Sequence, residues 1–115
     1  MINGINSREM ILEILLEIEE GEHSHVAIRN ALSKYQFLPK QDRAFITRVC
    51  EGTLEYRIQI DYIINSFSKV TVDKMKPAIR EILRSAVYQL KYMDSVPDSA
   101  VCNEAVKLAD RKSVV

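Results

Sequence analysis

The chain has 115 residues, of which 47% are hydrophobic, so it is long and apolar enough to build one hydrophobic core. Its 16 Lys and Arg residues balance its 16 Asp and Glu residues, so no overall positive field marks a nucleic-acid-binding protein, and any site for a polyanion has to be a local patch. The presence of only 3 Gly and 3 Pro argues against a disordered chain, and the lack of an apolar stretch of about 20 residues argues against a membrane span.

The first predicted helix spans residues 7–20, with Asn6 placed to cap it. Six Ile and Leu residues occupy most of its circumference, and they leave only a narrow acidic stripe at positions 9, 13 and 17. Because a helix this apolar needs neighbours on most sides, we expect it at the centre of a bundle. Gly21 ends this helix, and Ser24 is placed to cap a short second helix over residues 24–32.

A longer helical pattern follows Pro39. Apolar residues recur at helical spacing as far as Phe67, but Gly52 interrupts them. We therefore predict either one long helix bent near Gly52 and Thr53 or two helices with a tight break there. A glycine inside a helix costs about 1 kcal/mol relative to alanine, so we expect Gly52 to permit the close approach of another helix.

Two further helices complete the predicted fold. Asp73 is placed to cap the next helix, and Pro77 lies in its first turn, where the missing N–H does least harm. This helix ends near Tyr92, and Pro97 begins the last one, which covers residues 97–110. Short connections and hardly any strand signal predict an all-α protein, a compact bundle of five to six helices.

Little in the sequence points to catalysis. Cys50 and Cys102 lack the spacing of a metal site, His23 and His25 point to different sides of a helix, and no phosphate-binding glycine loop is present. Cys50 lies on the apolar side of its helix, which is typical of a packed, inert thiol. We therefore expect no enzyme activity, no metal and no cofactor in this chain, and we expect a cytoplasmic protein.

One candidate surface for RNA phosphates lies on the long third helix. Its basic residues are Lys40, Arg43, Arg48 and Arg57. Contacts from such residues position RNA without reading its sequence. Acidic residues at positions 42, 51 and 55 are interleaved with them, so scattered surface ion pairs are the alternative interpretation.

A second candidate surface lies on the helix that follows Pro77. Its members recur every four residues and are Arg80, Arg84, Tyr88 and Tyr92. Arginine with aromatic residues suits stacking on unpaired bases. However, a spacing of four residues drifts by about 40° per step around a helix, so the alternative is that the tyrosines flank the core.

Three blocks of sequence are distinctive in combination: SREMILEILLEIEEG (7–21), DRAFITRVCEGTLEY (42–56) and IREILRSAVYQLKYMDSVPDSAVCNEAVKLAD (79–110). Together they resemble the NusB-like RNA-binding domain, which is all-helical. The resemblance covers nearly the whole chain and is strongest to the N-terminal domain of the ribosomal RNA small-subunit (cytosine-C5) methyltransferase B family. It implies that residues 1–115 are one RNA-binding domain, cut from the N-terminal part of a larger methyltransferase that holds ribosomal RNA. We add Arg8 to the candidate RNA-binding residues.

In that family a separate catalytic domain uses S-adenosylmethionine, and its own cysteines do the chemistry. The resemblance therefore gives Cys50 and Cys102 no catalytic role, and it makes the catalytic domain of the same chain an expected partner. The alternative is a free-standing NusB-type transcription antitermination factor, which binds single-stranded RNA together with a ribosomal protein. The lone Arg8, in place of an N-terminal arginine cluster, and the acidic first helix weaken this alternative.

The last part of the chain raises two further expectations. NusB-like domains usually add another helix after this point, so its absence would leave apolar surface that could pair two copies as a homodimer. Asn103 and Glu104 lie within the pattern V-P-x-x-A-x-x-N-E-A-V, and a helical wheel places Asn103 opposite the apolar stripe and Glu104 on its flank. We expect both to tie the last helix to a neighbour or to its continuation rather than to contact RNA.

Overall fold

The computed structural model describes residues 7–113 and shows an all-helical protein, as predicted. Its elements in chain order are α1 (Ser7–Glu19), α2 (Ser24–Lys34), α3 (Lys40–Glu55), α4 (Arg57–Phe67), the short 3-10 helix η2 (Val72–Lys74), α5 (Pro77–Tyr92) and α6 (Asp98–Ser113). No strand occurs among these described residues, and none of their helices is long and apolar enough to cross a membrane. The predicted cap Asn6 lies outside them.

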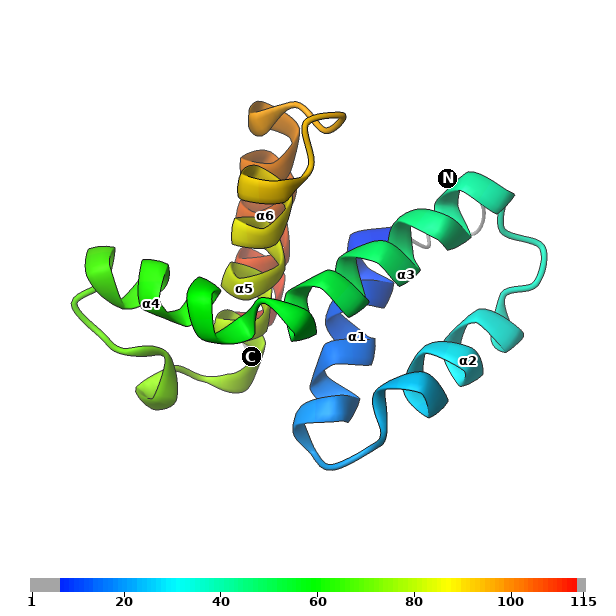
Figure 1. The fold of residues 1–115 in the computed structure, drawn as a ribbon, viewed down its shortest axis with the longest axis horizontal. Helices are drawn as coiled ribbons and strands as arrows, with labels where there is room; N and C mark the ends of the chain where they lie inside the picture. The colour runs from blue at the N-terminus through cyan, green and yellow to red at the C-terminus, as the bar shows by residue number, and fades with distance from the viewer. Residues whose placement is uncertain (1–6, 114–115) are drawn as a thin grey trace.

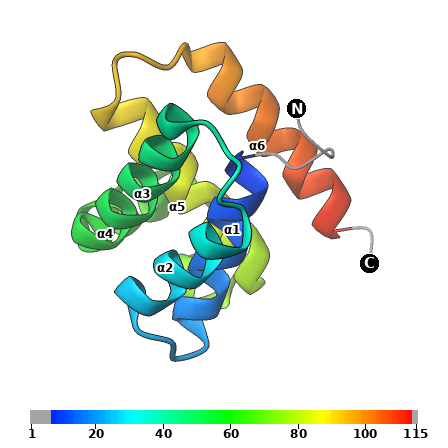
Figure 2. The ribbon, with the colours of Figure 1, turned by 90° about the vertical axis from the view of Figure 1, so that its right-hand side faces the viewer.

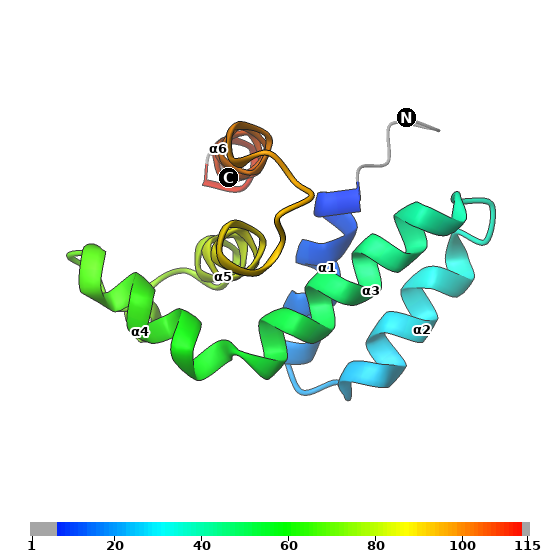
Figure 3. The ribbon, with the colours of Figure 1, turned by 45° about the horizontal axis from the view of Figure 1, so that its top comes forward.

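Helix α1 occupies the middle of the bundle. Figure 1 shows α3 leading into α4 to form one long arm, with α2 beside α3 and with α5 and α6 running antiparallel to each other. In Figures 2 and 3, α6 lies on the far side of α5 from the α3–α4 arm. The arm therefore forms one face of the molecule and α6 forms part of the opposite face.

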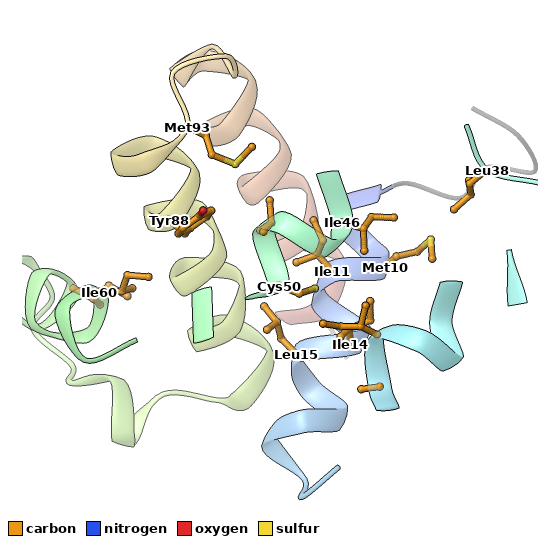
Figure 4. Close-up of a cluster of buried hydrophobic side chains, with 14 of the residues drawn as sticks. Met10, Ile11, Ile14, Leu15, Leu38, Ile46, Cys50, Ile60, Tyr88 and Met93 are labelled. Atoms are coloured by element: carbon orange, nitrogen blue, oxygen red, sulfur yellow. The ribbon is translucent and has the colours of Figure 1, made fainter. Parts of the chain in front are cut away.

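The main core is built around α1, as its apolar circumference predicts. Its buried members on α1 and α3 are Met10, Ile11, Ile14, Leu15, Ile46, Val49 and Cys50. Figure 4 shows Ile11 and Leu15 of α1 beside Ile46 and Cys50 of α3. Each fully buried Ile or Leu stabilises the fold by about 1.5–3 kcal/mol relative to an exposed one, so this contact anchors the arm to the bundle.

A smaller second core attaches α6. It consists of Leu12 on α1, Ile82 on α5 and Leu108 on α6, each at most 4% exposed. Helix α1 contributes to both cores, because most of its buried side chains pack in the main core and Leu12 packs in the second. This explains why its apolar residues occupy most of its circumference.

The junction between α3 and α4 lies four residues later than predicted. Gly52 stays inside α3, and the change of direction occurs at Tyr56, whose φ of −102° and ψ of 20° leave the helical region. The predicted close approach at Gly52 is confirmed, because a Cβ atom added there would collide with the ring of Tyr88. The glycine therefore serves helix packing and does not break the helix.

Helix caps differ from the sequence-based predictions at two positions. Asp73 lies in η2, and Lys76 is the cap residue of α5, directly before Pro77. Ser24 is the first residue of α2 rather than its cap, because the carbonyl of His23 already accepts the N–H groups of Val26 and Ala27. In both cases the helix starts one or more residues away from the side chain best suited to cap it.

Candidate nucleic-acid interface

A shallow groove of about 610 Å³ follows α3 and brings together three of the predicted basic residues, Lys40, Arg43 and Arg48. Leu32 of α2 and Tyr88 of α5 contribute to its walls. We call it the α3 groove. Because these three residues lie within about nine positions of one helix, at a rise of 1.5 Å per residue, their charges cover roughly 12 Å of its length.

The two arginines of the α3 groove also bind the ends of neighbouring helices. Arg43 Nη1 donates to the carbonyl oxygens of Leu32 (2.9 Å) and Tyr35 (3.2 Å), which lie at the C-terminal end of α2. Arg48 Nη2 donates to the carbonyl oxygen of Tyr92 (3.3 Å), at the end of α5. A guanidinium group at a helix C-terminus adds a hydrogen bond to the terminal carbonyls and interacts favourably with the helix dipole, so both arginines help to hold α2 and α5 against α3.

Positive and negative charges separate along the α3 groove. Lys40, Arg43 and Arg48 lie in the first part of α3, whereas Glu51 and Glu55 line the groove near its C-terminal end. Asp42, the third interleaved acidic residue, is not among the residues that line the groove, so the charges are less evenly mixed there than in the sequence. The fourth predicted residue, Arg57, is exposed at the first position of α4, beyond the residues that line the groove.

Three tyrosines stack on one another where the arm meets α5. The ring centroids of Tyr56 and Tyr92 are 4.4 Å apart, those of Tyr88 and Tyr92 are 5.3 Å apart, and all three rings lie within 27° of parallel. We call this group the tyrosine cluster. Tyr88 is buried in the core, which agrees with the alternative that the tyrosines of the second surface flank the core. Tyr56 is 38% exposed. Lys91 Nζ lies 5.6 Å from the Tyr92 ring centroid, within the range of a cation–π contact.

Arg80 and Arg84 lie apart from the α3 groove and bind carboxylates. Arg80 forms an ion pair with Glu19 of α1, and it donates to the carbonyls of Val72 and Met75. The residues of the second predicted surface therefore do not form one continuous surface. Its two arginines face α1 and α4, whereas its two tyrosines lie in the tyrosine cluster.

Arg84 is the centre of this ion-pair network. Its Nε and Nη2 atoms donate to the two carboxylate oxygens of Asp61 at 2.8 and 2.9 Å, and its Nη1 donates to Glu81 Oε2 at 2.6 Å. We call Glu19, Asp61, Arg80, Glu81 and Arg84 the α5 ion cluster. Both of its guanidinium groups are paired with carboxyl groups inside the protein, and this arrangement holds α5 to both α1 and α4.

The α5 ion cluster predicts a stability maximum near pH 5. Burial, with the nearby carboxylate of Glu19, raises the pKa of Glu81 from 4.5 to about 8, whereas the hydrogen bond from Arg80 lowers the pKa of Glu19 to about 2. Between pH 4.5 and 8 folded Glu81 holds a proton that the unfolded chain has lost, so stability falls as the pH rises through this window. Below pH 4.5 the unfolded chain protonates Glu19 first, so stability falls again.

Urea unfolding at pH 5, 6.5 and 8 tests this expectation. The free energy of unfolding should fall by about 3 kcal/mol from pH 5 to pH 8, and the Glu81→Gln variant, which cannot titrate at this position, should show a flatter profile. An identical slope in the two proteins would contradict the assignment to Glu81.

Arg8 lies at a junction of four helices. Its Nε donates to Gln89 Oε1 of α5 at 3.1 Å, and its guanidinium carbon lies 5.3 Å from the ring centroid of Phe45 on α3. Burial lowers the pKa of Arg8, and the negative charge of Glu104 on α6 partly opposes this shift. Glu104 therefore faces α1, as expected for a residue that ties α6 to a neighbour, whereas Asn103 is exposed.

An apolar groove of about 570 Å³ lies between α4 and α5. Its lining residues are Ile63, Ile64, Phe67, Ser68, Leu83, Val87, Leu90 and Lys91. Phe67 is 86% exposed, and the outer side of α4 adds Ile58 and Tyr62, which are 89% and 75% exposed. Exposed apolar side chains in this number on one short helix are typical of a surface that contacts another protein or domain.

The candidate residues predicted from the sequence do not include Tyr56, a member of the tyrosine cluster, or Lys91 beside it. In the sequence Tyr56 belongs to the apolar pattern of the long helix, and no motif marks Lys91. The change of direction at Tyr56 brings the ring onto Tyr92, a contact across 36 positions that no local pattern predicts. Cys50 behaves as expected, since it is buried and burial raises the pKa of its thiol.

Comparison with known proteins gives consistent matches. The NusB family model matches residues 5–114. The chain is 31% identical over 102 residues to a probable ribosomal RNA small subunit methyltransferase B of Bacillus subtilis and 34% identical over 106 residues to one of Synechocystis. The alignments cover 89% and 91% of this chain but 23% and 24% of those proteins, so the chain spans about a quarter of their length.

Antitermination proteins match over more of their own length. The chain is 31% identical over 109 residues to the transcription antitermination protein NusB of Acetivibrio thermocellus, covering 93% of this chain and 74% of that protein. Two solved structures have the same fold: NusB in a complex of antitermination factors NusB and NusE with double-stranded RNA, and NusB of T. maritima. The first has a TM-score of 0.82 and 18% sequence identity, and the match covers 92% of this chain and 80% of that chain. The second has a TM-score of 0.79 and 22% identity, and the match covers 93% of this chain and 78% of that chain. The chain belongs to the NusB family.

Proposed function

We propose that this chain binds RNA and that the α3 groove is its phosphate-binding surface. The observation that carries the proposal is the gathering of Lys40, Arg43 and Arg48 along one groove of an otherwise neutral protein. Phosphate contacts supply most of the non-specific affinity of nucleic-acid-binding proteins and position the strand. Arg80 and Arg84 contribute to folding in this proposal, because carboxylates neutralise their charges, and Arg8 does so because it is partly buried between α1, α3 and α5.

We further propose that the chain acts in the manner of the free-standing antitermination factors, with RNA and a protein partner. Its match to the antitermination protein of Acetivibrio thermocellus, over 74% of that protein's length, supports this mode of action. The apolar groove between α4 and α5 supports a protein partner, because exposed side chains such as Phe67 and Leu90 suit a protein interface better than an RNA one. One similar solved structure contains NusE together with NusB, so a ribosomal protein of that kind is the proposed partner.

The second candidate is the RNA-binding domain of a ribosomal RNA methyltransferase. Identities of 31% and 34% to two such proteins favour it. In that case residues 1–115 would be one domain of a larger protein, the S-adenosylmethionine chemistry would belong to another domain, and the apolar α4–α5 groove would contact it. The complete reading frame of the gene separates the candidates, because only the second requires a methyltransferase domain after this one.

A titration of single-stranded RNA at two salt concentrations tests the α3 groove. Binding should weaken as salt rises, because each neutralised phosphate releases counterions. The Lys40→Glu/Arg48→Glu double variant should bind at least tenfold more weakly at low salt. Its plot of log affinity against log salt should be shallower by about 1.4, the value for two lost contacts to a single strand.

The matched control is Lys107→Glu/Lys112→Glu, which makes the same change of net charge on α6. Figure 3 shows α6 on the far side of α5 from the α3–α4 arm. This control should keep nearly all of the affinity. Equal losses in the two double variants would mean that net charge, not the α3 groove, determines binding, and salt-independent binding by the unaltered chain would refute the proposal.

A further inference from the structure

The tyrosine cluster is continuous with the α3 groove. Tyr88 belongs to both, since it lines the groove and stacks with Tyr92 at 5.3 Å. Gly52, which also lines the groove, makes this possible because its missing side chain leaves room for the Tyr88 ring. A strand that follows the basic part of α3 towards its C-terminal end therefore reaches aromatic rings.

The exposed member of the cluster, Tyr56, is held in place by its contact with Tyr92. Tyr56 is 38% exposed, and its ring rests on Tyr92 with a centroid separation of 4.4 Å and an angle of 18°. Tyr92 is fixed in turn, because its hydroxyl donates to Gln59 Oε1 and its backbone carbonyl accepts from Arg48. A ring that is already ordered and partly exposed can stack on a base with little loss of its own freedom.

The cluster lies near both cations and carboxylates, since Glu51 and Glu55 line the same end of the α3 groove. Arg57 follows Tyr56 directly and is exposed, Lys91 Nζ lies over the Tyr92 ring, and Arg48 donates to the end of α5 next to that ring. Glu55, immediately before Tyr56, is the carboxylate closest in sequence. Aromatic rings beside a positively charged groove are the combination with which proteins bind single-stranded nucleic acids, since every base has a face that can stack.

We propose that the tyrosine cluster is a stacking site for an unpaired nucleobase of RNA whose phosphates lie in the α3 groove, with Tyr56 as the ring that contacts the base. This inference rests on the proposed function and adds the place at which the protein holds a base, which is the exposed ring of Tyr56. In a duplex each base is already stacked between its neighbours, so its faces cannot reach Tyr56.

Two measurements test the stacking site. Fluorescence anisotropy of a fluorescein-labelled oligouridylate gives the affinity. A second oligouridylate that carries one 2-aminopurine reports base stacking, because the fluorescence of this base is quenched when it stacks. The Tyr56→Ala variant should bind the strand about tenfold more weakly, within the range measured when an aromatic stacking partner is removed. It should also lose the quenching, while the slope of log affinity against log salt stays that of the unaltered chain, because no phosphate contact is removed.

Two variants control for changes in folding. Tyr56→Phe keeps the ring and should bind within about twofold of the unaltered chain. Tyr62→Ala removes a tyrosine of α4 that is 75% exposed and lies outside the cluster, and this variant should bind like the unaltered chain. Circular dichroism should show the same helical content in all variants.

The outcomes separate this inference from the proposed function. Wild-type affinity and quenching in Tyr56→Ala, combined with weak binding by Lys40→Glu/Arg48→Glu, would overturn the stacking site and leave the α3 groove in place. Equal losses in Tyr56→Phe and Tyr56→Ala would also overturn it, as would an equal effect of Tyr56→Ala on a matched RNA duplex. A complete lack of salt-sensitive RNA binding by the unaltered chain would overturn both.

Discussion

Replacing Arg84 with alanine is expected to lower the free energy of unfolding by about 3–5 kcal/mol, the cost of removing one partner of a buried ion pair. Arg84 makes two parallel hydrogen bonds to Asp61 and a third bond to Glu81, and its side chain is only 9% exposed. Without the guanidinium group, the carboxylate of Asp61 loses its positive partner, and Glu81, which is buried and has a raised pKa, loses its hydrogen bond. The loss therefore includes the cost of one unpaired carboxylate as well as the lost bonds.

Urea denaturation followed by circular dichroism measures this change. Arg57→Ala is the matched control, since Arg57 is exposed, and it should shift stability by less than about 0.5 kcal/mol. Arg84→Lys keeps the charge without the planar pair of donors and should fall between the two. Equal stability of Arg84→Ala and the unaltered chain would show that the α5 ion cluster does not hold α5 to α1 and α4.

Gly52→Ala is expected to destabilise the protein by about 2 kcal/mol, although alanine is the better helix former. In an exposed helix the substitution would stabilise by about 1 kcal/mol, so the sign of the effect decides between helix propensity and packing. At Gly52 the new Cβ would occupy the space of the Tyr88 ring, and Tyr88 is buried and stacked with Tyr56 and Tyr92. The ring or α5 has to move, which opens the contact between α3 and α5.

Thermal or urea unfolding of the double variant Gly52→Ala/Tyr88→Leu isolates this contact. Leucine lacks the atoms that collide with the added Cβ, so the two substitutions together should cost less than the sum of their separate costs. Strict additivity, or a stabilising effect of Gly52→Ala alone, would show that the close approach at Gly52 does not limit stability.

The fold was largely predictable, because each helix is specified by a pattern of apolar residues within its own short segment of sequence. The apolar circumference of residues 7–20 correctly predicted a central helix, and Gly52 correctly predicted a close helix contact. The position of the break was wrong, because Gly52 remains helical against Tyr88 and the chain turns at Tyr56 instead. A glycine marks where a helix can bend, whereas packing determines whether it does.

The candidate site was predictable only in part, because its information is mostly non-local. Lys40, Arg43 and Arg48 share one helix, so their spacing was enough to place them together. Arg80 and Arg84 looked equally available in the sequence, but their partners Glu19 and Asp61 are 61 and 23 positions away. Helical periodicity describes the side of a helix on which a residue lies and carries no information about the carboxylate that another helix brings to it.

The hydrogen bonds from Arg43 and Arg48 to helix ends have a consequence for the entropy of RNA binding. A free arginine side chain carries about 2 kcal/mol of rotamer entropy, which a phosphate contact would normally have to overcome. Here the carbonyls of Leu32 and Tyr92 restrict these side chains as the protein folds. Under the proposed function, the chain meets RNA with two of its cations already oriented, and the rigidity of α2 and α5 becomes part of the affinity.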